Sequence, residues 1–187
     1  MLTCGFFPIP DYDHPPACVM VWGSNLFQTN EEGILGSQLR RALDRGAKLL
    51  VIDPRKTAIA SRANLWLQPR PGTDLALALG MLRVMVDQGL YEKSFVENWT
   101  NGFLELKEHL EQYPLDRVSE TTWVPEDQIV QAARFFSQSK PACIQWGNAL
   151  EHNLNSFQCA RALLILMAVT GNLETPGGNV NRVGPPV

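Results

Sequence analysis

Small and polar residues follow directly after two short apolar runs, and these are the residue types that could bind a ligand. The run 18–22 stops at Gly23-Ser24-Asn25, and the run 48–52 stops at Asp53-Pro54-Arg55. The segment 31–45 between them repeats its apolar residues with the period of a helix. Two parallel strands joined by a helix place their carboxyl ends at one sheet edge, where open α/β sheets bind nucleotides. The pattern therefore predicts a nucleotide site on a β–α–β unit.

Each of these groups also has a purely local interpretation. Glycine at Gly23 lets a ligand approach the backbone and Asn25 offers both a donor and an acceptor, but the same residues suit a turn closed by its own side chains. Asp53 suits the hydroxyls of a ribose, or a turn that precedes proline. Arg55 suits a phosphate or a surface carboxylate. The residues alone leave both interpretations open.

Two later stretches offer further candidates. Gly72-Thr73-Asp74 precedes the apolar segment 74–88, so it suits a helix N-cap. Alternatively, the carboxylate of Asp74 could accept two parallel hydrogen bonds from the N1–H and N2–H₂ donors of guanine. His152 follows the apolar run 142–146 and the turn at Gly147, and suits either a hydrogen bond to a ligand or an exposed loop. No second histidine or cysteine stands at metal-ligand spacing, so no metal site is predicted.

The elements needed to position these groups predict an α/β fold. We expect strands at 18–22, 48–52, 65–67 and 142–146, and the run 48–52 lacks alternation, as does a parallel strand covered on both faces. Helices are expected over about 31–45, 74–88, from 125 and from 156. The predicted architecture is a doubly wound, mostly parallel sheet with helices on both faces, a Rossmann-like three-layer α/β/α fold. Residues 1–187 are expected to form one domain, with an extended lead-in at 1–17 and an irregular tail at 173–187.

One electrostatic detail shapes the prediction for the first loop, 23–30. Glu31 and Glu32 are expected in the first turn of the following helix, where they would repel a phosphate placed on the helix axis. A pyrophosphate should therefore lie over the backbone amides of residues 23–25.

Composition excludes several classes of function. The 187 residues carry a net charge of −3, which gives no basic field for nucleic acid, and no apolar run is long enough to span a membrane. No signal-peptide pattern opens the chain, so the compartment stays open. There is no G-x-G-x-x-G after a strand, no P-loop and no G-x-S-x-G elbow. The four cysteines form no Cys-x-x-Cys pair, which predicts small buried side chains instead of zinc or iron–sulfur ligands.

Several motifs in order resemble the molybdopterin oxidoreductases, the dimethyl sulfoxide reductase family, which includes formate dehydrogenases, nitrate reductases and polysulfide reductases. They are Trp22-Gly23-Ser24-Asn25, Gly46-Ala47-Lys48 with 51–55, Arg70-Pro71-Gly72-Thr73-Asp74, Thr170-Gly171-Asn172 and Pro176-Gly177-Gly178. The resemblance covers nearly the whole chain. It implies one α/β domain of a larger molybdenum or tungsten enzyme, in which two molybdopterin guanine dinucleotides hold the metal and this domain binds one of them.

The resemblance also implies roles for particular residues. The loop from Trp22 to Thr29 would lie along the pyrophosphate, 53–56 would meet the ribose and guanosine, and Asp74 would recognise the guanine edge. The loop with Gly147, Glu151 and His152 would approach the cofactor from the last strand, although many members have glycine at the position of Asn148 and glutamine at that of Glu151. The metal ligand and any iron–sulfur cluster would lie outside this stretch, and Cys4 is too close to the first strand to be that ligand.

For the parent enzyme the resemblance implies two-electron redox chemistry, with hydration in a minority of relatives, and an isolated domain without activity. Its partners would be the remaining domains of the parent catalytic subunit and electron-transfer subunits. The alternatives are a stand-alone Rossmann-like nucleotide-binding module without metal chemistry, and a structural relative that has lost its cofactor.

Overall fold

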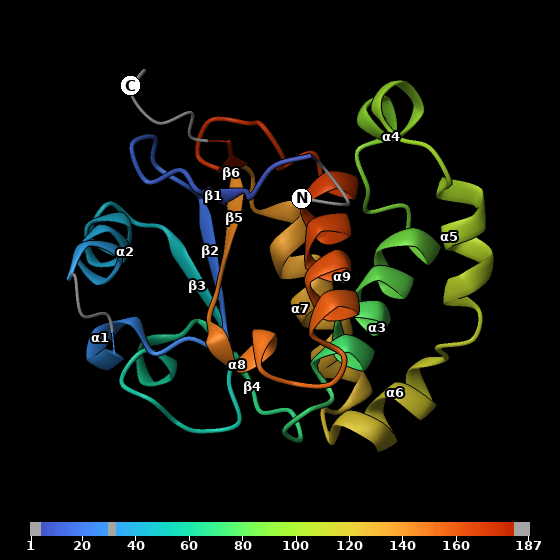
Figure 1. The fold of residues 1–187 in the computed structure, drawn as a ribbon, viewed down its shortest axis with the longest axis horizontal. Helices are drawn as coiled ribbons and strands as arrows, with labels where there is room; N and C mark the ends of the chain where they lie inside the picture. Colours follow the sequence, from blue (N-terminus) through green and yellow to red (C-terminus); the bar gives the residue numbers. More distant parts are fainter. Residues whose placement is uncertain (1–4, 30–32, 182–187) are drawn as a thin grey trace.

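A four-stranded parallel sheet forms the centre of the computed structural model, which describes residues 5–29 and 33–181 (Figure 1). Its strands are β2 (Cys18–Trp22), β3 (Lys48–Ile52), β4 (Leu65–Leu67) and β5 (Ala142–Trp146), in spatial order β4-β3-β2-β5. The chain steps outward from β2 to β3 and β4, then returns to place β5 on the other side of β2. The strand order therefore reverses between β2 and β5, and such a reversal is where doubly wound sheets bind ligands at their carboxyl edge.

Helices cover both faces of the sheet, as predicted (Figure 1). On one face, α2 (Ile34–Asp44) packs Leu39 against Val19 and Val51 of the sheet. On the other face, α3 (Asp74–Asp87), α7 (Glu126–Gln138) and α9 (Ser156–Val169) bury the alternate strand residues, including Met20. Three short helices lie outside α3, namely α4 (Lys93–Trp99), α5 (Phe103–Leu110) and α6 (Leu115–Thr122). The predicted doubly wound α/β fold is confirmed.

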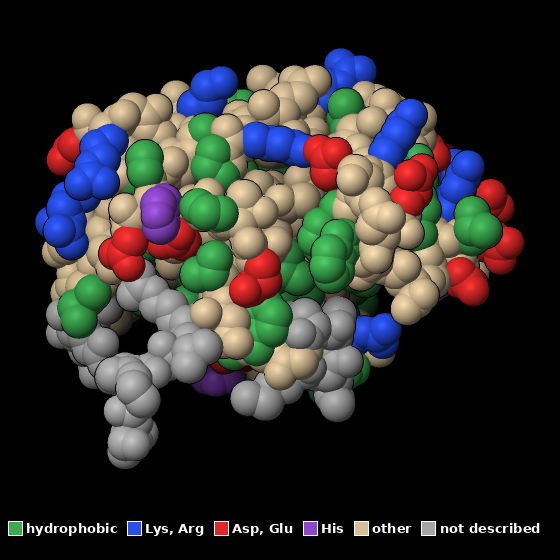
Figure 2. Space-filling model, turned by 90° about the horizontal axis from the view of Figure 1, so that it is seen from above, with side chains coloured by type: hydrophobic (Ala, Val, Ile, Leu, Met, Phe, Trp, Pro, Cys, Tyr) green, Lys and Arg blue, Asp and Glu red, His purple; other side chains and the backbone are tan. Residues whose placement is uncertain are grey.

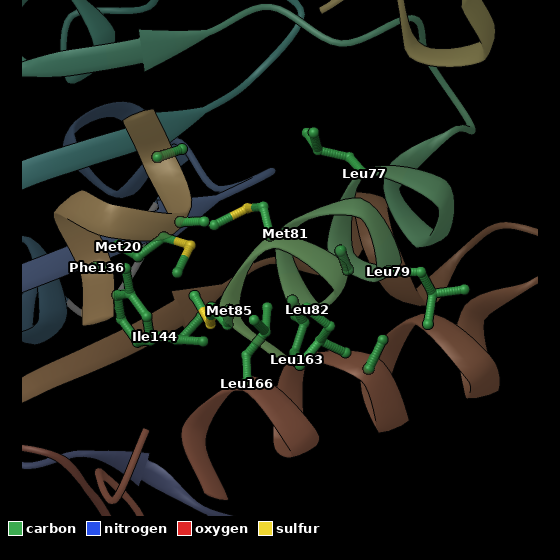
Figure 3. Packing of buried hydrophobic residues seen from close by; sticks show 14 of the residues in the cluster. Met20, Leu77, Leu79, Met81, Leu82, Met85, Phe136, Ile144, Leu163 and Leu166 are labelled. Carbon is green, nitrogen blue, oxygen red and sulfur yellow. The ribbon is translucent and has the colours of Figure 1, made fainter. Parts of the chain in front are cut away.

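Helix α3 is the middle of the larger core. Nine of its residues are buried, because helices pack around it as well as the sheet. Figure 3 shows Met81 and Met85 on its sheet-facing side, near Met20 of β2 and Phe136 of α7, while Leu82 faces α9. A helix that is apolar nearly all round is expected to be buried in this way. The site residue Asp74 is the first residue of this rigid element.

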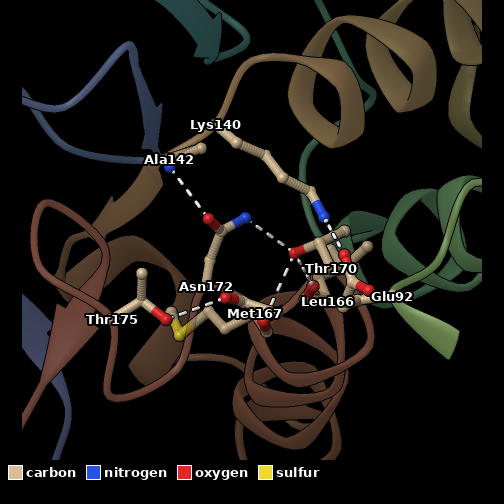
Figure 4. Close-up of polar contacts among 9 residues, drawn as sticks. Glu92, Lys140, Ala142, Leu166, Met167, Thr170, Asn172 and Thr175 are labelled. Carbon is tan, nitrogen blue, oxygen red and sulfur yellow. Dashed lines mark hydrogen bonds and ion pairs between the residues drawn. The ribbon is translucent and has the colours of Figure 1, made fainter. Parts of the chain in front are cut away.

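The outer side of β5 is bonded to asparagine side chains instead of a fifth strand. Asn172 Oδ1 accepts the N–H of Ala142 at 2.9 Å, and Asn172 Nδ2 donates to Thr170 (Figure 4). Asn179 accepts the N–H of Ile144 at 2.7 Å and donates to the carbonyl of the same residue at 2.9 Å. Because both asparagines are at most 1% exposed, these bonds satisfy backbone groups that water cannot reach.

The structure differs from the expected irregular tail. Asn179–Val180 form β6, which pairs antiparallel with β1 (Ile9–Pro10) from the lead-in. Figure 2 shows the face of the molecule above this pair in the view of Figure 1, where acidic and basic side chains are interspersed. The two ends of the described chain are thus joined beside the outer edge of β5, where Asn179 bonds Ile144.

The first loop and helix also differ in detail from the prediction. A single-turn helix, α1 (Leu26–Thr29), lies within the expected loop 23–30. Helix α2 begins only at Ile34, after Gly33 with φ of 67°. Glu31 and Glu32 lie outside the described residues. A short 3₁₀ helix, Ala60–Arg62, and the short helix α8, Asn148–Glu151, complete the elements.

Candidate cofactor site

The loops after β2 and β5 pack against each other at the point where the strand order reverses. Gly147 N–H donates to the carbonyl of Trp22 at 3.1 Å, and Gly23 N–H donates to the carbonyl of Ile52 at 2.8 Å. A Cβ added at Gly147 would lie 2.6 Å from the carbonyl oxygen of Gly23 and 2.9 Å from Cβ of Ser24. Glycine at this position is therefore explained by backbone packing between the two loops, not by an observed ligand.

Asn25 directly precedes α1, and one of its polar atoms accepts no hydrogen bond from the described residues. Its carbonyl accepts the N–H groups of Gln28 and Thr29 at 2.9 and 3.0 Å, and its Nδ2 donates to Oε1 of Gln28 at 2.7 Å. Its Oδ1 is buried and has no hydrogen-bond partner among the residues that the structure describes. The local turn that the sequence left as an alternative is thus present, but it leaves one acceptor free at the carboxyl edge.

Asp53 is turned toward its own loop. The side chain is buried, and its Oδ1 accepts the N–H of Arg55 at 2.8 Å and lies 3.9 Å from Nε of the same arginine. The neighbouring strand holds this loop, because Trp66 Nε1 donates to the carbonyl of Asp53 at 2.9 Å and Gln68 Nε2 donates to that of Pro54 at 2.7 Å. Gln68 was not predicted as a site residue, although it directly follows β4 as Asp53 follows β3.

Asp74 is half-buried at the start of α3, but it does not cap its own helix. Its Oδ1 accepts a hydrogen bond of 2.8 Å from Nε1 of Trp22, a residue 52 positions earlier. Thr73 occupies the N-cap without a side-chain cap bond and donates instead to the carbonyl of Arg70 at 2.7 Å, next to the exposed Gly72. The N-cap interpretation of this stretch is therefore not what the geometry shows. Trp22 itself is fully buried, so its side chain does not lie along the surface of the loop.

The segment after β5 folds into α8 instead of an open loop. Trp146 Nε1 donates to Oε1 of Glu151 at 3.0 Å, and both residues line a cavity of about 190 Å³ between β5, α2 and the start of the described chain. His152 is exposed just after this turn. Gln145, which sequence reasoning also missed, lines this cavity, and its buried Oε1 accepts no hydrogen bond from the described residues.

The cysteines Cys18, Cys143 and Cys159 are buried and reduced, and we call them the three buried cysteines. Burial raises the pKa of Cys18 and of Cys159 to about 12, and it raises the pKa of Cys143 well above its usual value. Within the described ranges, no group of three or more His, Cys, Asp or Glu side chains could hold a metal ion. Cys4 lies outside those ranges. The structure thus presents these three thiols as core residues, as predicted.

Acceptor groups gather near the carboxyl edge of this sheet. The buried acceptors of Asn25 and Gln145 face no protein donor among residues 5–29 and 33–181. Asp74 adds a carboxylate on a fixed helix start. Pterin, guanine and ribose groups all carry N–H or O–H donors that could satisfy such acceptors. No helix in the described part of the chain is long and apolar enough to cross a membrane.

Comparisons with known proteins agree on one family. The family model for molybdopterin oxidoreductases matches residues 7–184. Acetylene hydratase of Syntrophotalea acetylenica is 44% identical over 83% of this chain, and formate dehydrogenase H of Escherichia coli is 34% identical over 88%. The F420-dependent formate dehydrogenase subunit alpha of Methanocaldococcus jannaschii is 32% identical over 88%.

A solved structure gives the same result. The acetylene hydratase from Pelobacter acetylenicus superposes with a TM-score of 0.85 at 40% identity, covering 91% of this chain and 23% of that one. The chain spans only 21% to 24% of the length of the relatives named above. These matches do not favour an unrelated stand-alone nucleotide-binding module, and the family carries a molybdopterin cofactor. The chain belongs to the molybdopterin oxidoreductase family.

Proposed function

We propose that this chain is the single domain that holds one molybdopterin guanine dinucleotide of a larger molybdenum or tungsten enzyme. The observation that carries the proposal is the arrangement at the reversal of strand order. There, the loops after β2 and β5 meet beside an acceptor of Asn25 that has no protein donor and the half-buried carboxylate of Asp74. Doubly wound sheets bind dinucleotides at this place.

The roles of individual residues follow from their positions along the edge. The amides of Ser24 and Asn25 lie just before α1 and would face the pyrophosphate, whereas the predicted contribution of the Gly23 amide is wrong, because that N–H donates to the carbonyl of Ile52. Asp53, Pro54 and Arg55 would meet the ribose, although the Asp53 carboxylate must share the oxygen that accepts the N–H of Arg55. The segment 147–152, with Glu151 and His152, would lie toward the pterin.

Asp74 would select the base. Its carboxylate has two oxygens with about four acceptor positions in all, and Trp22 uses one of them. The remaining positions suit the adjacent N1–H and N2–H₂ donors of guanine. Adenine presents an acceptor at N1, which a carboxylate would repel. Gly72 and Thr73 would line the solvent-accessible side from which guanine reaches this carboxylate.

When bound, the cofactor would supply two-electron redox chemistry at its metal. Hydration is a second candidate for the parent, because the relative at 44% identity is an acetylene hydratase. Turnover of the full-length parent with formate and a dye acceptor, compared with acetylene in the absence of an acceptor, separates these activities. The parent would also contain the metal ligand, further domains, an iron–sulfur cluster and contacts with electron-transfer subunits, all outside this chain.

Nucleotide titration tests the binding proposal. Calorimetry of the chain should show tighter binding of GDP than of ADP, and Asp74→Asn should remove that preference, because an amide replaces one acceptor with a donor. Hydrogen bonds to a charged group contribute about 1.5–3 kcal/mol, so the GDP affinity should fall at least tenfold. Asp44→Asn is the matched control, since it makes the same charge change on an exposed residue at the far end of α2. Equal binding of both nucleotides by the unaltered chain would refute the proposal.

A further inference from the structure

Trp22 is the last residue of β2, one of the two central strands of the sheet, and neighbouring residues enclose it completely. It lies opposite Ile52 of β3 and Trp146 of β5, and its side chain is 0% exposed. Its carbonyl accepts the N–H of Gly147, and the N–H of the next residue, Gly23, donates to Ile52. Both the backbone and the indole ring of Trp22 are therefore fixed by the sheet and its core.

The only polar atom of this indole is directed at Asp74. Nε1 of Trp22 donates to Oδ1 of Asp74 at 2.8 Å, and an indole nitrogen can donate but not accept. Within the described ranges, no other hydrogen bond or ion pair to the Asp74 side chain occurs. Cys159, on the neighbouring helix α9, lies close enough for the Asp74 charge to help raise the pKa of its thiol, but burial is the larger cause. One oxygen of Asp74 is thus anchored to the core.

The second oxygen of Asp74 is placed differently. Asp74 is half-buried, and its Oδ2 accepts no hydrogen bond from the described residues but is not a buried atom. This oxygen is therefore exposed at the surface of the carboxyl edge. Fixing one oxygen of a carboxylate fixes the plane in which the other can accept. An unanchored aspartate would instead have to lose rotamer freedom when a ligand binds.

We propose that Trp22 is a positioning residue for base selection, which acts through Asp74 and does not touch the ligand. The indole N–H holds the Asp74 carboxylate in the orientation that accepts both guanine donors. This inference rests on the proposed guanine site. Within the loop from Trp22 to Thr29, which was expected along the pyrophosphate, the Trp22 side chain is wholly enclosed and so would act only through Asp74.

A purely structural role for the same hydrogen bond makes a different prediction. If the bond only satisfies a buried indole, its loss should lower stability without changing which base is preferred. If Trp22 positions Asp74, its loss should weaken GDP binding more than ADP binding, and only while the Asp74 carboxylate is present. A double-mutant cycle separates the two roles, since it isolates the coupling between residues in contact.

The experiment is calorimetric titration of GDP and ADP into the chain and its variants. Trp22→Phe should lower the GDP-over-ADP affinity ratio by about tenfold, as expected for a lost hydrogen bond to a charged group. In the Asp74→Asn background, the same substitution should change the ratio less than about twofold. Phe136→Leu is the control for core loss, because it removes volume from the same cluster without contacting Asp74, and it should leave the ratio unchanged.

A second variant removes the N–H without removing volume. Site-specific replacement of Trp22 by benzothienylalanine puts sulfur in place of the indole nitrogen and should reproduce the loss of preference at nearly unchanged thermal stability. If this variant keeps the full GDP preference while Asp74→Asn abolishes it, the positioning role is wrong and the guanine site stands. If Asp74→Asn also keeps the preference, the proposed guanine site itself is wrong and the inference falls with it.

Discussion

Replacing Asn179 with alanine should destabilise the chain far more than the loss of one small side chain suggests. The amide of Asn179 accepts the N–H of Ile144 at 2.7 Å and donates to its carbonyl at 2.9 Å. Both residues are 0% exposed, so water cannot replace either bond. A buried polar group left without a partner costs about 1–3 kcal/mol, and two such groups give a loss of about 2–6 kcal/mol. That is a large share of the roughly 5–15 kcal/mol by which folded proteins are stable.

Aspartate at this position tests the two bonds separately. Asp at 179 would have the same shape and could still accept the N–H of Ile144, but its ionised form cannot donate to the carbonyl. Burial would raise the pKa of the new carboxyl above its unfolded value of about 3.9. Asn179→Asp should therefore lose at least as much stability as the alanine variant at neutral pH. It should recover part of that stability as the pH falls through the raised pKa, because the protonated carboxyl can donate.

Urea unfolding followed by circular dichroism measures these losses. For a chain of this size, the alanine variant should also melt roughly 4–24 °C lower than the unaltered chain. Asn101→Ala, at an exposed position before α5, is the control and should change stability by less than about 0.5 kcal/mol. If Asn179→Ala matched this control, the outer side of β5 would not depend on asparagine bonds and the reasoning would be refuted.

Two other predictions concern buried titrating groups. In a Cys4→Ser variant at pH 8, the three buried cysteines should not react with a thiol reagent until denaturant is added, since burial keeps them protonated; rapid labelling of the native chain would contradict this. Burial raises the pKa of Asp11, but hydrogen bonds from Gly177 and His14 outweigh it and hold that pKa below the usual 3.8. The stability from this carboxylate is complete above that usual value and is lost as the pH falls toward the lowered pKa, so Asp11→Asn should flatten the loss measured by urea unfolding below about pH 4. An equally steep acid loss in both proteins would refute the role of Asp11.

The sequence predicted the elements whose signals are local. The run 48–52 has no alternation because both of its faces are covered, and the structure places β3 at those residues. The segment 74–88 is apolar nearly all round because helices and sheet surround α3. By contrast, β1 and β6 are two residues long, and each becomes a strand only by pairing with a segment about 170 positions away. No local pattern can reveal such a pair.

The candidate site also combines features that the sequence predicts with features that it does not. Its location at the carboxyl edge follows from strand–helix–strand order, and the predicted residues do lie after β2, β3 and β5 and at the start of α3. Their hydrogen-bond partners do not follow, because they depend on which side chains meet across the sheet. Asp74 looked like a helix cap in sequence, yet it bonds to Trp22. Gln68, which directly follows β4 and lies 14 positions after Pro54, donates to the carbonyl of Pro54.

The motifs that suggested the family have two different structural roles: some bond the edge of β5, and others form the loops at the carboxyl edge. Thr170-Gly171-Asn172 and Pro176-Gly177-Gly178 lie at the amino-terminal end of β5, where Asn172 and its neighbour Asn179 bond the strand. Gly147, at the other end of β5, packs so tightly on Gly23 that any shift of the strand would move the two loops relative to each other. The hydrogen bonds of Asn172 and Asn179 to the outer edge of β5 therefore also affect the spacing of the loops after β2 and β5. The stability of the fold and the geometry of the proposed cofactor site are linked through the position of this one strand.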